Sequence, residues 1–200
     1  TGEPRSATVV AVRDSVLVQL DKPQFEELVL RYPQVSLAFT RQMIHRLQTE
    51  RERHGVAAPV TVGLLPISAD VSAGEFATRL AAELAHHGRV ALTSAAAMED
   101  ALGEPGLCAR DDAEADHRIS IALDALEARH DFVLLLADDA PGAWTRRCVR
   151  NSDEILLLAD ATCEPRLHPN ETACLAGRST GSEAAEILLL LHPPETQMPR

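Results

Sequence analysis

The sequence contains one pattern that is typical of serine hydrolases. Gly177, Ser179 and Gly181 have the GxSxG spacing, in which a sharp turn between a strand and a helix exposes the nucleophilic serine. The motif works only when a buried strand precedes it and a loop elsewhere supplies N–H groups to the oxyanion. Residues 172–176 make a poor, short strand, and no glycine-rich oxyanion loop precedes them. We therefore predict a flexible loop around Ser179 and no catalytic residue in this chain.

A second region stands where nucleotide hydrolases have a phosphate-binding loop. Residues 62–76 read as a buried strand, a loop and the start of a helix. A working loop needs closely spaced glycines and a lysine that contacts the β- and γ-phosphates. This segment has neither, Asp70 adds a negative charge, and Lys22 is the only lysine in the chain. Asp138 and Asp139 could hold a metal ion in such a fold, but without the lysine we predict a nucleotide fold retained as a scaffold.

The third candidate site is formed by Arg5, Ser6 and Ala7, which β-branched residues follow. An arginine fork and neighbouring backbone N–H groups can hold a cyclic phosphate. The pattern resembles the end of the phosphate-binding cassette of cyclic-nucleotide-binding domains. That family also places a glutamate on the ribose hydroxyl, well before the arginine, and Glu3 is too close to Arg5 for this role. We expect a remnant site without a bound cofactor here, whereas the intact parent domain could bind a cyclic nucleotide.

Other reactive side chains show no spacing that indicates a site. The four cysteines form no CxxC pair and the histidines show no ligand spacing, so we expect buried free thiols and no metal site. The net charge of −11 argues against nucleic-acid binding. The longest apolar run, 187–191, is far shorter than the ~20 residues of a membrane span. No signal peptide opens the chain, and we expect it in the cytoplasm.

Charge and pattern divide the chain into two predicted domains, 1–55 and 56–200. The first carries a net charge of +1 and the second −12, and a short linker bounded by glycine and proline separates them. Asp21 is a plausible helix N-cap, with Pro23 in the first turn. The first domain is expected to contain two strands and two helices in the order 6–12, 16–20, 21–30 and 35–53. This order resembles the C-terminal piece of a cyclic-nucleotide-binding β-roll.

The second domain alternates short apolar segments with amphipathic ones, which indicates the α/β class. Such alternation predicts a parallel sheet covered by helices on both faces. The expected strands are 60–67, 90–93, 132–137, 154–159 and 187–191. The expected helices are 73–87, 95–102, 117–130 and 143–151. Residues 104–115 and 162–182 are predicted to be irregular.

This second domain resembles the septum- and plasmid-positioning ATPases with deviant Walker motifs, so that a P-loop-like, Rossmann-like fold is implied. The resemblance rests on the helix and strand around 76–92, and on residues 130–142, where an apolar strand ends in aspartate before Pro-Gly. Together, the two domains resemble the bacterial neuropathy target esterase-like, patatin-type phospholipases. The matching features in the middle region of that family are Asp138, Trp144, Thr145, Cys148, Arg150 and Asp153.

The family resemblance implies a regulatory and scaffolding segment of a multidomain lysophospholipid esterase. Its serine hydrolase chemistry would belong to a patatin domain, which would be the partner of this segment in the same polypeptide. A membrane-lipid substrate and membrane association would come through the parent protein. Two alternatives remain open. The second domain could be an active ATPase-like domain, or the chain could belong to a cyclic-nucleotide-responsive signalling protein whose acidic domain binds a partner.

Overall fold

The computed structural model describes residues 19–32, 34, 36, 59–69, 71–177, 185–193 and 196 of the 200-residue chain. These residues belong to two units, and each is described by itself. The predicted hairpin and the predicted helix over 35–53 lie, apart from a few positions, outside the described residues, as does the predicted domain boundary at 55/56.

The smaller unit contributes helix α1 (Lys22–Arg31). Its first turn is closed by a capping box: Gln24 N donates to Asp21 Oδ1 at 2.9 Å, and Asp21 N donates to Gln24 Oε1 at 3.2 Å. Pro23 stands in the first turn, where its missing N–H has no helical partner to lose. The predicted cap and the predicted first-turn proline are therefore confirmed.

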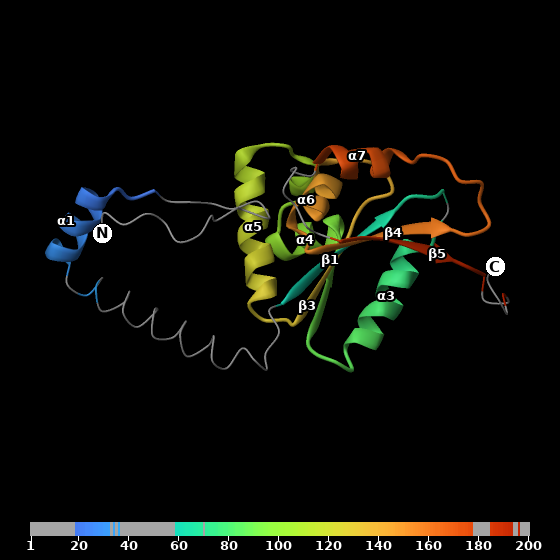
Figure 1. Ribbon diagram of the computed structural model, residues 1–200, viewed down its shortest axis with the longest axis horizontal. Helices are drawn as coiled ribbons and strands as arrows, with labels where there is room; N and C mark the ends of the chain where they lie inside the picture. The colour runs from blue at the N-terminus through green and yellow to red at the C-terminus, as the bar shows by residue number, and fades with distance from the viewer. Residues whose placement is uncertain are drawn as a thin grey trace. The chain divides into compact units, whose positions relative to one another are not determined.

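The larger unit is built on a five-stranded sheet in which every neighbouring pair is parallel, in the order β2-β3-β1-β4-β5 (Figure 1). Its strands are β1 (Val60–Pro66), β2 (Val90–Thr93), β3 (Phe132–Leu136), β4 (Glu154–Asp160) and β5 (Ala185–Leu191). Its helices are α3 (Ala73–Leu84), α4 (Ala95–Leu102), the short 3₁₀ helix η1 (Leu107–Ala109), α5 (Ala113–Glu127), α6 (Ala143–Asn151) and α7 (Pro169–Gly177). The predicted α/β class with a parallel sheet is confirmed.

Two segments predicted to be irregular contain helices. The helix α5 begins four residues earlier than expected, because Asp112 Oδ1 accepts a hydrogen bond from Ala115 N at 3.0 Å and caps the new first turn. The helix α7 occupies part of 162–182. There His168 N donates to Glu171 Oε2 at 3.1 Å, which satisfies a backbone group at the helix start. At the start of both α5 and α7, a side chain from a polar stretch accepts hydrogen bonds from the backbone, and this is why the two predictions were wrong.

Helices cover the two faces of the sheet unequally. One face, called the four-helix face here, packs against α4, α5, α6 and α7 together with η1. The opposite face, called the α3 face, packs against α3, which is the only helix on it among the described residues (Figure 1). Large buried side chains on the four-helix face include Leu65, Met98, Leu107, Ile119, Leu135, Trp144 and Ile155. The core of the α3 face is smaller and contains Val62, Leu64, Ala73, Ala77, Leu134 and Leu158.

Candidate functional site

The loops that follow β1 and β3 meet at the carboxyl end of the sheet. After β1 the chain enters α3 on one face, and after β3 it enters α6 on the other face. Ligands of open α/β sheets bind at such a switch in chain direction. The structure has a depression of about 460 Å³ here. Its lining residues are Val71, Ser72, Ala73, Gly74, Ser94, Leu136, Ala137, Asp138 and Asp139. The segment that stands in place of a phosphate-binding loop thus lies beside Asp138 and Asp139.

The charge of this depression is acidic. No lysine or arginine is among the described residues that line it, and Asp70 lies outside the described residues. Burial raises the pKa of the Asp138 carboxyl, and the negative charges of Asp139 and Glu99 add to this effect. No group of three or more His, Cys, Asp or Glu side chains suited to a metal ion occurs among the described residues. A phosphate group would therefore meet like charge in this depression.

The start of α3 also differs from a phosphate-binding loop. Ser72 is the N-cap, but its side chain makes no capping hydrogen bond. A Cβ atom added at Gly74 would meet no atom within 4 Å, so this glycine is not required by a close approach of other protein atoms. In a phosphate-binding loop, glycines are needed because the backbone closely surrounds the phosphates. Gly74 is therefore an ordinary first-turn residue of α3 in this structure.

Asn170 joins the ends of the two strands that flank the depression. Its side chain is fully buried, and Nδ2 donates to the carbonyl of Pro66 at 3.0 Å and to that of Asp138 at 2.9 Å. The helix α7 therefore fixes the backbone that follows both β1 and β3. Sequence reasoning missed Asn170 because 162–182 was predicted to be irregular. Pro169 at the first helical position, with Glu171 close behind, is the signal that could have identified this helix start.

Residues that carry the family resemblance use their polar atoms within the fold. Trp144 Nε1 donates to the Leu136 carbonyl at 2.8 Å and ties α6 to β3. Asp153 Oδ2 accepts from Thr61 N at 2.8 Å and ties the start of β4 to β1. Cys148 is fully buried, and burial raises the pKa of its thiol well above the ordinary value. The hydrogen bonds of Trp144 and Asp153 stabilise the sheet and α6. The Cys148 thiol is protonated and enclosed, so it is not a nucleophile.

Arg147 is a buried cation that sequence reasoning did not identify. Only 2% of its surface is exposed, and Nε donates to Asp116 Oδ1 at 2.6 Å. Its other nitrogens donate to the carbonyls of Cys108, at 2.9 Å, and Arg110. The helix α6 thus holds the connection between α4 and α5. In that connection Arg110 also pairs with Asp112 at 2.7 Å, and this hydrogen bond lowers the pKa of Asp112 to about 2.

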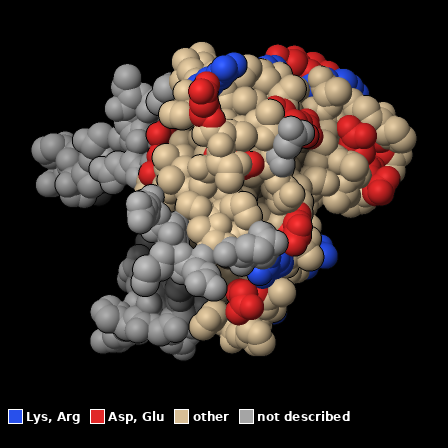
Figure 2. All heavy atoms as spheres, turned by 90° about the vertical axis from the view of Figure 1, so that its right-hand side faces the viewer, with Lys and Arg blue, Asp and Glu red and all other residues tan. Residues whose placement is uncertain are grey.

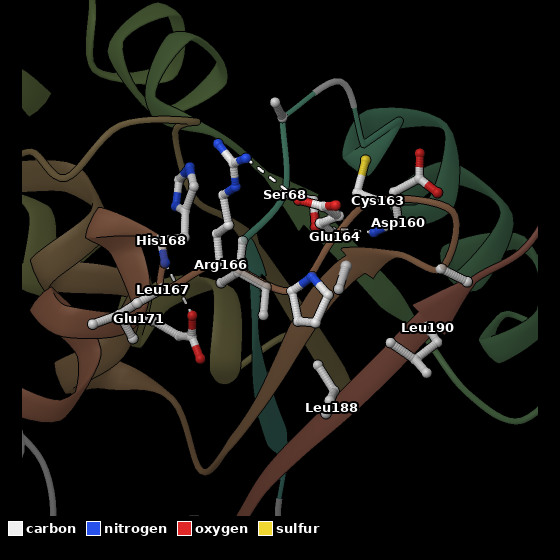
Figure 3. Close-up of a pocket in the computed structure, with 15 residues that line it drawn as sticks. Ser68, Asp160, Cys163, Glu164, Arg166, Leu167, His168, Glu171, Leu188 and Leu190 are labelled. Atoms are coloured by element: carbon white, nitrogen blue, oxygen red, sulfur yellow. Dashed lines mark hydrogen bonds and ion pairs between the residues drawn. The ribbon is translucent and has the colours of Figure 1, made fainter.

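A larger depression, of about 1100 Å³, lies at the carboxyl ends of β1, β4 and β5 (Figure 3). Leu188 and Leu190 project into it from β5, and the segment between β4 and α7 forms the opposite side. Its only described arginine, Arg166, pairs with Glu164 at 3.4 Å, and both side chains are highly exposed. The geometry therefore shows an open, partly apolar surface rather than an enclosed catalytic site.

One predicted remnant site and the serine of the rejected hydrolase motif lie outside the described residues. Arg5, Ser6 and Ala7 form the remnant site, and Ser179 is that serine. The segment before Ser179 is described, and it is the helix α7, which corrects the expectation of a poor strand over 172–176. A nucleophile elbow requires a strand at that position. In the described part of the chain, no helix combines the length and the apolar character needed to cross a bilayer.

The sequence of the chain is similar to that of known proteins. A model described as "Neuropathy Target Esterase family P-loop like domain" matches residues 59–200. The chain is 30% identical to "Lysophospholipase NTE1" of Yarrowia lipolytica, and the aligned region covers 94% of this chain and 14% of that protein. It is 30% identical to "Patatin-like phospholipase domain-containing protein 7" of Rattus norvegicus, and the aligned region covers 100% of this chain and 16% of that protein. The chain therefore spans about one sixth or less of these relatives.

A solved structure supports the fold. The crystal structure of a plasmid partition protein from Borrelia burgdorferi superposes with a TM-score of 0.50 at 10% sequence identity, covering 67% of this chain and 79% of that protein. At this identity the similarity concerns the fold alone. The predicted P-loop-like, Rossmann-like architecture and its resemblance to plasmid-positioning proteins are confirmed at that level.

Proposed function

Because the chain belongs to the neuropathy target esterase family, we propose that it is a non-catalytic regulatory and scaffolding segment of a multidomain patatin-like phospholipase. The ester hydrolysis would then belong to a patatin domain in the same longer polypeptide, and that domain would be the partner of this segment. The lipid substrate and any association with membranes would also come through the parent protein, with this segment on the cytoplasmic side.

The observation that carries this proposal is the acidic depression at the carboxyl ends of β1 and β3. A site for ATP must offset the charge of the triphosphate with cations and N–H donors. Here the described lining residues supply two carboxylates, Asp138 and Asp139, and no cationic side chain. Two carboxylates could face a metal ion, but for the phosphate oxygens the described lining offers only the hydroxyls of Ser72 and Ser94 and the N–H groups at the start of α3, without a cation. This arrangement favours a retained fold over an ATPase.

The buried polar contacts support the scaffolding part of the proposal. Trp144 ties α6 to the preceding strand β3, and Arg147 and Asn170 join elements that are distant in the sequence, in each case through hydrogen bonds to main-chain carbonyls. Such contacts hold the loops at the carboxyl end of the sheet in one arrangement. A domain whose loops are held in one arrangement suits the transmission of contacts between neighbouring domains.

The test measures both chemistries on the purified chain. We expect no thermal stabilisation by ATP with Mg²⁺, no phosphate release, and no hydrolysis of a p-nitrophenyl ester. The variants are Asp138→Ala and, as a matched control, Asp124→Ala, an exposed carboxylate on α5. Stabilisation by several degrees with turnover that Asp138→Ala abolishes and Asp124→Ala retains would establish the ATPase alternative instead.

The regulatory part is tested in the full-length polypeptide. We expect Arg147→Met to reduce lysophospholipid hydrolysis, because the contacts of α6 with the α4–α5 connection would be lost, while Asp124→Ala leaves hydrolysis unchanged. Equal hydrolysis by both variants and the wild type would show that the enzyme works independently of this segment.

A further inference from the structure

The strand β5 is apolar along most of its length and yet exposed. Ile187, Leu188 and Leu190 have exposed fractions of 40%, 56% and 55%. Continuous apolar runs in parallel sheets are typical of strands that are covered on both faces. Side chains alternate along a strand, so Ile187 faces the same side as Leu189 and Leu191, which pack on the core of the α3 face. The exposure of Ile187 therefore shows that the α3 face is incompletely covered at β5, whereas Leu188 and Leu190 face the other side of the sheet.

A groove of about 730 Å³ lies between α3 and β5. Phe76 and Leu80 of α3 form one apolar wall, and Leu191 and Pro193 lie across from them. The groove is continuous with the core of the α3 face, to which Phe76, Leu80 and Leu191 also belong as partly buried members. An apolar occupant of this groove would extend a core that already exists.

The dimensions of the sheet suit one additional helix. A helix with its side chains is about 10 Å wide, and neighbouring strands are about 4.8 Å apart, so that one helix covers about two strands. The contacts of α3 are with β1, β2 and β3. Leu158 of β4 is already fully buried in the core of the α3 face, so the outer strand β5 is the part of this face that a second helix could cover. The 12 residues of α3 extend over about 18 Å, which sets the expected length of a helix that lies beside it.

The charge at the groove is predominantly negative. Glu75, Glu83 and Asp160 line it, and Arg79 pairs with Glu75 at 3.9 Å. The face turned to the viewer in Figure 2 shows acidic side chains at several places, with basic ones beside some of them, on a largely uncharged surface. Residues 56–200 together carry a net charge of −12. A complementary occupant would have basic side chains beside its apolar stripe.

We propose that this groove binds an amphipathic helix with an apolar stripe and a basic flank, and that this helix belongs to the same longer polypeptide. The chain spans only 14–16% of the two relatives described above, so most of each relative's polypeptide lies outside the matched region. The assignment of the helix to that polypeptide rests on the proposed function. The groove and the chemistry of its occupant rest on the structure alone.

The groove is tested with a labelled peptide of about 14 residues, long enough to match α3, with leucine at helical spacing and lysine on both flanks. We expect the chain to bind it more tightly than a peptide of equal composition with scrambled leucine positions, and more tightly than a version with glutamate flanks. Ile187→Lys should weaken binding by about tenfold, because Ile187 lies beside the groove, on the same face of β5 as Leu191, where the helix would cover it. Ile121→Lys is the matched control, since Ile121 is 54% exposed on α5 at the opposite face.

The thermal melts of both variants show whether they remain folded, and both positions are exposed enough to accept lysine. Binding that is equal for the ordered and scrambled peptides, or weakened equally by Ile187→Lys and Ile121→Lys, would overturn the groove as a helix site. Loss of binding through Ile187→Lys alone supports it.

The source of the helix is tested by hydrogen exchange in the full-length polypeptide. We expect the amides of β5 to exchange at least about tenfold more slowly there than in the 200-residue chain, which corresponds to about 1.4 kcal/mol of added protection. Equal exchange rates would overturn the proposal even if the peptide binds, because the helix would then come from a separate protein. Protection that grows with concentration would identify a second copy and would also overturn it. None of these outcomes changes the ATP and ester assays, so the two proposals can fail separately.

Discussion

The two faces of the sheet are made from the same apolar strands but are completed differently. The four-helix face encloses Trp144, Ile119 and Met98, all with at most 2% of their surface exposed. The α3 face has a single described helix and leaves Ile187 of the outer strand 40% exposed, while Leu188 and Leu190 are exposed at the edge of the four-helix face. The strands themselves carry the same demand for burial on both sides, so the difference lies in the helices. The four-helix face holds the larger part of the segment's own core, and the α3 face is where other protein can contribute.

The strongest test of this difference is a pair of aromatic truncations. Trp144→Ala on the four-helix face should lower the free energy of unfolding by about 3–5 kcal/mol, because it leaves a cavity and an unpaired Leu136 carbonyl. Phe76→Ala on the α3 face should cost about half as much, since Phe76 is only partly buried. Urea denaturation followed by circular dichroism measures both values. Equal losses would mean that the two faces contribute equally.

The next largest effect is expected at the buried cation of the four-helix face. Arg147→Met should lower the free energy of unfolding by about 3 kcal/mol, because Asp116 and two carbonyls lose their donor while the aliphatic volume is kept. Arg79→Met on the α3 face is the control, since its exposed pair with Glu75 should contribute little. A loss below about 1 kcal/mol for Arg147→Met would show that α6 does not depend on this contact.

The smallest effects are expected from two glycine substitutions with opposite signs. At Gly63 a new Cβ would lie 2.7 Å from Ser152 Oγ, which donates to the Cys148 carbonyl on the four-helix face. Gly63→Ala should therefore cost about 1–3 kcal/mol. Gly74→Ala, in the open first turn of α3, should add about 0.5 kcal/mol, because alanine loses less backbone entropy on folding. Thermal melts check both signs, and destabilisation by Gly74→Ala would indicate an unseen close approach at that loop.

Much of the fold could be predicted because local signals coincide with the element ends. The helix α4 has the predicted limits, since Ser94 accepts from Ala97 N at 3.4 Å and Gly103 ends the helix with a φ of 66°. The strand β2 and the helix α6 also match. Apolar runs bounded by such residues leave little freedom for another assignment.

The remaining features depend on contacts between distant residues, which spacing does not show. In the sequence, Arg147 is one of several arginines in α6. It is buried because the connection between α4 and α5 folds over it. Asn170 stands in a polar stretch without periodicity, and its role depends on two carbonyls at the ends of separate strands. Asp138 and Asp139 were considered as metal ligands in a nucleotide fold, and in the structure they line one depression with residues 71–74. Whether they hold a metal ion stays a prediction.

The single tryptophan has a consequence for spectroscopy. Trp144 is the only tryptophan of the chain, it is 1% exposed, and its indole N–H is bonded to a main-chain carbonyl. Its fluorescence emission should therefore be blue-shifted in the folded chain and shift to the red when the four-helix face opens. The α3 face has no such fluorophore. Emission therefore reports on the core of the four-helix face, and binding at the groove beside β5 would leave the emission unchanged unless its effects reach α6.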